Sequence, residues 1–67
     1  MGFKEEIAKI FKEAREKQDL TQKEVAEKAG IDDNYYARIE RAEVAARGEI
    51  LNKVAKALGV KIKLPIN

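Results

Sequence analysis

Residues 20–40 decide the fold, and they read Leu-Thr-Gln-Lys-Glu-Val-Ala-Glu-Lys-Ala-Gly-Ile-Asp-Asp-Asn-Tyr-Tyr-Ala-Arg-Ile-Glu. Thr21 is followed three residues later by Glu24, which is the spacing of a capping box at a helix start. Leu20 and Val25 occupy the two positions of a hydrophobic staple around the same start. Because two independent signals coincide on one turn, we expect a helix to begin here.

A second short helix is predicted directly after the first. The helix that begins after Thr21 is expected to end near Ala29, because Gly30 supplies a C-terminal stop. Asp32 can cap the following helix, which is expected to end near Arg41. Two short helices joined by a glycine-containing turn are the pattern of a helix-turn-helix.

Such a motif requires a small residue where the helices cross and a turn residue that tolerates positive φ. Ala26 and Gly30 meet these two requirements. The apolar residues placed to lock the helix pair from inside are Val25, Ala29, Ile31, Tyr36 and Ile39. The exposed face of the second helix is then free to enter a DNA major groove.

The flanking segments are also predicted to be mostly helical. Residues 3–17 place Phe3, Ile7, Ile10, Phe11 and Ala14 at helical spacing among charged residues, which predicts an amphipathic helix. Residues 42–48 lack a clear period and are predicted to form a loop. A further helix is predicted from about Glu49 to the stop at Gly59, with Leu51, Val54, Ala55 and Leu58 on its apolar face.

The C-terminal residues show the periodicity of a strand. Val60, Ile62, Leu64 and Ile66 alternate with Lys61, Lys63 and Pro65. An unpaired strand edge tends to recruit another chain. One hypothesis is therefore that these four apolar residues mediate dimerisation, as a two-stranded antiparallel ribbon across a homodimer axis. The alternative is an extended tail that lies over the helical core.

Length and composition limit the possible function. A chain of 67 residues predicts one small domain over 1–67, with the helix-turn-helix at about 21–41 and the extended tail at about 60–67. The sequence has no cysteine and no histidine, so it lacks the residues of thiolate zinc sites and the commonest general base. No motif indicates a buried carboxylate pair or a phosphate-binding glycine loop. We therefore expect no enzymatic activity, no cofactor and no metal.

Charge is unevenly distributed, although the net charge is only +2. Residues 50–67 contain four lysines and no acid, whereas residues 1–49 carry a net charge of −2. The basic end either faces an anionic partner such as nucleic acid or forms a solvated surface. The sequence contains no run of about 18 apolar residues, so no membrane helix is expected. The N-terminus has no apolar signal core. A cytoplasmic location is expected.

The stretch from Ile10 to Leu64 resembles the Cro/C1-type (Xre-like) helix-turn-helix family of prokaryotic and phage repressors and antitoxins. The resemblance is carried by Arg15, Leu20-Thr21-Gln22-Lys23-Glu24-Val25-Ala26, Gly30-Ile31, Arg38-Ile39-Glu40 and Ala57-Leu58-Gly59-Val60. It implies an all-α fold: a compact four- to five-helix, lambda-repressor-like bundle with a helix-turn-helix and a short extended C-terminal segment.

The sequence departs from the family pattern at a few positions. Ala42 stands where a glycine usually follows the Ile-Glu pair, and Ala46 and Arg47 stand where Pro and Ser or Thr usually open the fourth helix. Tyr36 stands where a branched aliphatic residue is common.

The resemblance implies that Gln22, Asp33, Asn34, Tyr35 and Arg38 contact DNA, and the positively charged Lys23, Arg41 and Arg47 complete the expected set of DNA-binding residues. Asn34 has the chemistry to bind adenine and Arg38 to bind guanine, whereas Asp33 can accept a hydrogen bond from cytosine. Gln22 is similar to the family glutamine that touches phosphate, the alternative being a solvated first-turn residue. For Asp32 and Asp33, the alternative role is to cap the helix and stabilise its dipole.

Arg15 and Glu40 match a family pair that forms an internal salt bridge between the first and third helices. The resemblance therefore implies a structural role for both residues.

Two function classes remain open. The first is a sequence-specific DNA-binding transcriptional regulator, a dimeric repressor or antitoxin-type autorepressor that reads double-stranded DNA with the helix around 33–41. The second is a protein-interaction module that binds a partner such as a toxin on a helix-turn-helix scaffold. Salt dependence separates the two, because DNA binding weakens steeply with added salt, since each phosphate that the protein neutralises releases counterions.

Overall fold

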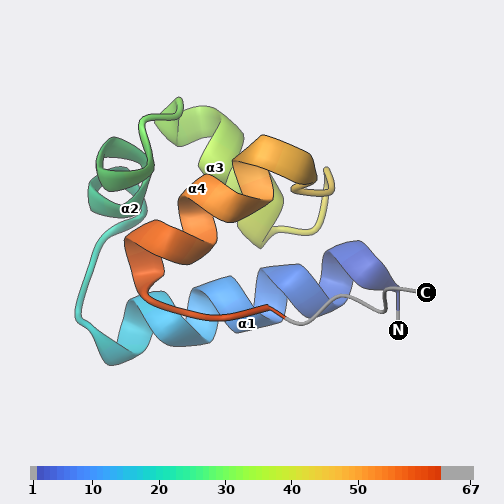
Figure 1. Cartoon of the computed structure of the whole chain (residues 1–67), viewed down its shortest axis with the longest axis horizontal. Helices are drawn as coiled ribbons and strands as arrows, with labels where there is room; N and C mark the ends of the chain where they lie inside the picture. Colours follow the sequence, from blue (N-terminus) through green and yellow to red (C-terminus); the bar gives the residue numbers. More distant parts are fainter. Residues whose placement is uncertain (1, 63–67) are drawn as a thin grey trace.

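The protein is described by a computed structural model that places residues 2–62. Four α-helices follow one another in this part of the chain (Figure 1): α1 (Phe3–Lys17), α2 (Gln22–Ala29), α3 (Asp33–Glu40) and α4 (Gly48–Leu58). The all-α expectation is confirmed. None of the helices within residues 2–62 is long and apolar enough to cross a membrane.

The helix boundaries of the central pair follow from their capping residues. The Thr21 hydroxyl accepts a hydrogen bond from the Glu24 amide at 3.0 Å, and the Glu24 carboxylate accepts one from the Thr21 amide at 2.8 Å. This capping box begins α2 as predicted. Gly30 ends α2 in the left-handed conformation with φ 73°. The Asp32 carboxylate then accepts from the Tyr35 amide at 3.0 Å and caps α3.

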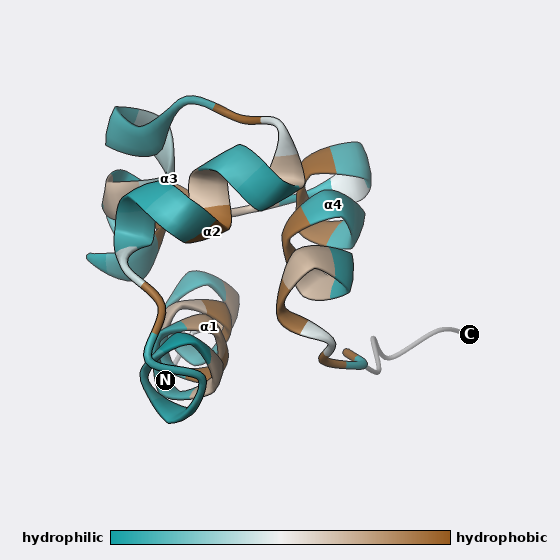
Figure 2. Ribbon diagram, turned by 90° about the vertical axis from the view of Figure 1, so that its left-hand side faces the viewer, coloured by the Kyte–Doolittle hydropathy of each residue, from teal (hydrophilic) through white to brown (hydrophobic). Residues whose placement is uncertain are grey.

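The core lies where the four helices meet, with α1 on one side of it (Figure 1). Helix α1 packs against α3 and α4, and α2 packs against the same two helices. Figure 2 shows the apolar sides of the helices turned inward. The largest fully buried side chains are Phe11, Val25, Tyr36, Ile39 and Val54. Every helix thus contributes to one apolar cluster that holds α2 and α3 in place.

The loop between α3 and α4 contains a residue in an unfavourable backbone conformation. Ala42 adopts a positive φ of 59°, a region that side chains with a Cβ atom rarely occupy. This is the position at which the family pattern usually has glycine. Ala46 is fully buried, and Arg47 precedes α4 without making a side-chain cap. The loop is therefore anchored by packing at Ala46 and lacks a polar cap at the start of α4.

The chain beyond α4 turns back beside α1 (Figure 1). Gly59 ends α4 with φ 70°, and the Val60 amide donates to the Ala55 carbonyl at 3.0 Å. Val60 and Ile62 are partly buried and pack against the core. Residues 60–62 are not part of a strand, and Leu64 and Ile66 lie outside the described residues. The described part of this segment accordingly covers the helical core.

Candidate nucleic-acid interface

Helices α2 and α3 form the predicted helix-turn-helix. The turn closes through a hydrogen bond of 3.0 Å from the Ile31 amide to the Ala26 carbonyl. Ala26 is 1% exposed, as expected for a small residue at the point where helices approach closely. Val25, Ala29, Tyr36 and Ile39 are buried, and Ile31 is partly buried against them. All six residues assigned to the inside of the motif are therefore inside.

The outward face of α3 carries the side chains that were predicted to read bases. Asp33, Asn34 and Arg38 are exposed. Tyr35 differs from them, because it is half-buried and packs against the core while part of its surface stays accessible. Lys23 is exposed on α2 and lines a shallow hollow between α2 and α3 together with Asp33. Lys23 of α2 and Asp33 of α3 thus lie on the same side of the motif.

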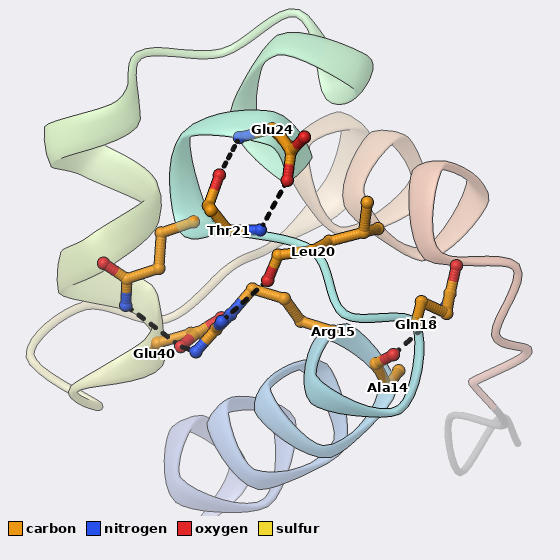
Figure 3. A network of polar contacts seen from close by, with 8 residues as sticks. Ala14, Arg15, Gln18, Leu20, Thr21, Glu24 and Glu40 are labelled. Atoms are coloured by element: carbon orange, nitrogen blue, oxygen red, sulfur yellow. Dashed lines mark hydrogen bonds and ion pairs between the residues drawn. The ribbon is translucent and has the colours of Figure 1, made fainter.

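Arg15 and Glu40 are brought together across the core boundary (Figure 3). The Arg15 guanidinium donates to both carboxylate oxygens of Glu40, from Nε at 2.6 Å and from Nη2 at 3.0 Å. Arg15 Nη1 also donates to the Leu20 carbonyl at 2.9 Å. The side chain of Glu40 is only 3% exposed and that of Arg15 15% exposed. This bidentate pair ties α1 to the end of α3 and to the segment that leads into α2.

Gln22 joins the same network. Its Nε2 donates to Oε1 of Glu40 at 3.0 Å, so the side chain of the first residue of α2 is held against the end of α3. The amide group retains a second N–H for another acceptor. Gln22 is therefore a positioned residue, not a freely solvated one. The sequence offers no signal for this contact, since it joins residues that lie far apart in the chain.

The environment of Glu40 favours its charged form. Burial raises the pKa of Glu40, but the hydrogen bonds from Arg15 and Gln22, together with the nearby Tyr36 hydroxyl, outweigh burial and lower the pKa. The hydrogen bond to Glu40 likewise raises the pKa of Arg15. The pair is thus fully ionised at neutral pH.

Tyr36 has a buried hydroxyl for which no hydrogen-bond partner lies within range among residues 2–62. Burial raises the pKa of Tyr36 well above its ordinary value, and the negative charge of Glu40 raises it further. The hydroxyl is therefore neutral and lies near the Glu40 carboxylate, whose charge it stabilises, although no hydrogen bond within range joins the two groups.

A second cluster of charges lies where α3 ends. Glu43 binds Arg41 through contacts of 2.6 Å to Nε and 3.4 Å to Nη2, and its Oε1 is 3.4 Å from Nε of Arg38. All three side chains are about half exposed. Sequence reasoning assigned Arg38 and Arg41 to DNA and did not single out Glu43. Arg47 is exposed at the start of α4.

Nothing in the described part of the chain resembles a metal site. Within residues 2–62, no group of three or more acidic residues is placed to hold a metal ion.

Comparison with protein families identifies the class to which this architecture belongs. A helix-turn-helix family model of the Cro/C1 type matches residues 11–64, which is most of the chain. The protein is therefore a member of the Cro/C1-type helix-turn-helix family, a family of DNA-binding regulatory domains. No curated protein matches the sequence, and no solved structure matches it.

Proposed function

We propose that this protein is a sequence-specific transcriptional regulator that acts as a homodimer, either a repressor or an antitoxin-type autorepressor of its own operon. The observation that carries the proposal is the exposed pair Asn34 and Arg38 on α3, which is held by a fully packed helix-turn-helix. Helix α3 enters the major groove and reads base edges. Such a protein acts in the cytoplasm, where the DNA is.

The side chains of this surface divide into two kinds of contact. Asn34 has the donor and acceptor needed for two hydrogen bonds to adenine, and Arg38 has the fork geometry that fits guanine. Phosphate contacts come from Lys23, Arg41 and Arg47, which are all exposed. The second N–H of Gln22 and the free backbone amides at the start of α2 add a further phosphate contact. These contacts fix the register in which α3 meets the bases.

Dimerisation rests on apolar surface near the ends of the chain. Phe3 and Ile10 are exposed large apolar side chains on α1, and Ile10 and Val60 line one shallow hollow with Leu58. Ile62 and Val60 line a second hollow against α4. A second copy that covers this surface gives the protein two helix-turn-helix units, which fit half-sites about 34 Å apart.

The dimer is tested by mass. Deletion of residues 61–67 is expected to convert a dimer into a monomer in light scattering, while circular dichroism shows that the truncated protein remains helical. An unchanged mass for the folded truncated protein removes the C-terminal segment from the interface.

DNA recognition is tested by selection from a random duplex library at about 0.1 M salt, where charges interact over about 10 Å. The expected result is one enriched motif with two related halves, whose spacing gives the dimer geometry. Failure of the folded protein to enrich any motif contradicts the proposal.

The second candidate, a protein-interaction module that binds a toxin or another partner, is favoured by one observation. The N-terminal end of α3 carries Asp32 and Asp33 side by side, and Glu27 lines the same hollow on α2. Three carboxylates on this surface repel phosphate and attract a basic protein surface. Binding to such a partner without any DNA binding at low salt is the result that favours this function.

A further inference from the structure

Glu43 forms ion pairs with both arginines that flank the end of α3, Arg38 and Arg41. Its carboxylate lies 2.6 Å from Nε of Arg41 and 3.4 Å from Nε of Arg38. The Arg41 guanidinium, which is expected to contact phosphate, therefore already has an anionic oxygen at the place where a DNA phosphate oxygen would bind. The cluster of three side chains has a net charge of +1 in place of the +2 of the two arginines alone.

The backbone puts Glu43 in this position. The Glu43 amide donates to the Arg38 carbonyl and the Ala42 amide to the Ile39 carbonyl, each at 3.0 Å. This is the hydrogen-bond pattern of a Schellman motif, with Ala42 in the left-handed conformation. The turn directs the chain back over the last turn of α3, so that the carboxylate reaches arginines two and five residues before it.

The fold gains little from an acid at this site. A carboxylate near the C-terminus of a helix meets the negative end of the helix dipole, which is unfavourable. Exposed ion pairs of this kind contribute little to stability, because solvent screens the two charges. Glu43 is 46% exposed and does not contribute to the apolar core. The effect of Glu43 is therefore on what the two arginines can bind.

We propose that Glu43 is a specificity-determining residue, which competes with DNA phosphates for Arg41 and thereby suppresses binding to non-operator DNA. This inference rests on the proposed DNA-binding function. Non-specific complexes depend almost wholly on phosphate contacts, so they lose the largest share of their affinity when a carboxylate must first be displaced. Complexes with the selected sequence keep their base contacts and lose proportionally less.

The test compares Glu43→Gln with Glu13→Gln, which removes the same charge from an exposed position on α1. Binding of each variant to a random-sequence duplex and to the selected duplex is measured by fluorescence anisotropy from about 50 to 200 mM salt. For Glu43→Gln, we expect several-fold tighter binding to random duplex and a log–log salt slope steeper by about one. The ratio of selected to random affinity falls. Glu13→Gln shows neither change beyond a small general charge effect.

The outcomes separate this inference from the function on which it rests. If the wild type binds DNA and Glu43→Gln matches Glu13→Gln in affinity, slope and specificity ratio, the role of Glu43 is refuted while DNA binding stands. If the folded wild type binds neither duplex at the lowest salt, both proposals fail. The NMR chemical shifts of the Arg41 Nε–H nitrogen and proton give a readout that needs no DNA. They change in Glu43→Gln only if the Glu43 carboxylate forms the ion pair with this group in solution.

Discussion

Arg15 on α1 and Glu40 at the end of α3 share two hydrogen bonds, and the Glu40 oxygen that accepts the longer one also accepts Nε2 of Gln22. One buried carboxylate therefore links α1, the first residue of α2 and the last residue of α3. Arg15 and Glu40 are in this way connected to Gln22, the residue expected to contact phosphate. This arrangement gives the Arg15–Glu40 pair a part in presenting the DNA-binding surface as well as in holding the fold.

Removing Glu40 is expected to destabilise the protein strongly. Glu40→Ala leaves the Arg15 guanidinium without its partner and Gln22 without its acceptor, and breaking this part-buried ion pair from one side costs up to the roughly 3–5 kcal/mol of a fully buried pair. Urea denaturation measures the loss, with Glu13→Ala on the exposed face of α1 as the control. The double variant Arg15→Met, Glu40→Leu is expected to regain part of the stability, because it leaves no buried charge. An unchanged midpoint for Glu40→Ala contradicts the structural role.

Stability is expected to fall in acid through the same residue. The folded protein holds the pKa of Glu40 below its ordinary value, although burial alone acts in the opposite direction. The stabilisation from a lowered carboxylate pKa is therefore fully present above the unfolded value of about 4.3 and disappears as the pH falls through the folded pKa. Denaturation midpoints from pH 7 down to about 3 should decline less in Glu40→Gln than in the wild type. Parallel curves for the two proteins would assign the acid sensitivity to other groups.

Ala42→Gly is expected to stabilise the protein. Ala42 has a φ of 59°, and a left-handed conformation costs a residue with a Cβ atom about 1–2 kcal/mol. Glycine relieves this strain but adds freedom to the unfolded chain, so the net gain should be about 1 kcal/mol or less. Ala45→Gly in the same loop has no positive φ to relieve and should lower stability. Thermal melts of both variants test this contrast, and a lower midpoint for Ala42→Gly would be inconsistent with the described turn.

Tyr36→Phe is expected to keep or raise stability. The hydroxyl is buried without a partner among the described residues, and an unsatisfied buried polar group costs about 1–3 kcal/mol. Its removal leaves the packing of the ring unchanged. Tyr35→Phe, where the side chain is half exposed, is the matched control. A loss of more than about 1 kcal/mol in Tyr36→Phe would mean that the hydroxyl donates to Glu40 in solution.

The sequence predicts the helices well because their ends carry local signals. The capping box at Thr21, the stop at Gly30 and the cap at Asp32 act within a few residues, and each one is present in the structure. The apolar positions of α2 and α3 are equally predictable, since helical spacing determines which face is buried.

The polar contacts of the site were less predictable. The bond from Gln22 to Glu40 and the contacts of Glu43 with Arg38 and Arg41 depend on how helices cross and how the loop turns. No periodicity or cap in the sequence encodes these distances. The unpartnered Tyr36 hydroxyl is likewise visible only once the packing around it is known.

Asn34 on the exposed face of α3 provides the most direct test of base recognition by this helix. Binding of wild type, Asn34→Ala and Asn52→Ala to the selected duplex is compared with binding to duplexes changed one base pair at a time. Asn52 is exposed on α4 and serves as the matched control. We expect Asn34→Ala to lose about 1–3 kcal/mol of discrimination at one base pair in each half-site, while Asn52→Ala keeps the wild-type profile. Identical base preferences for all three proteins would contradict recognition through α3.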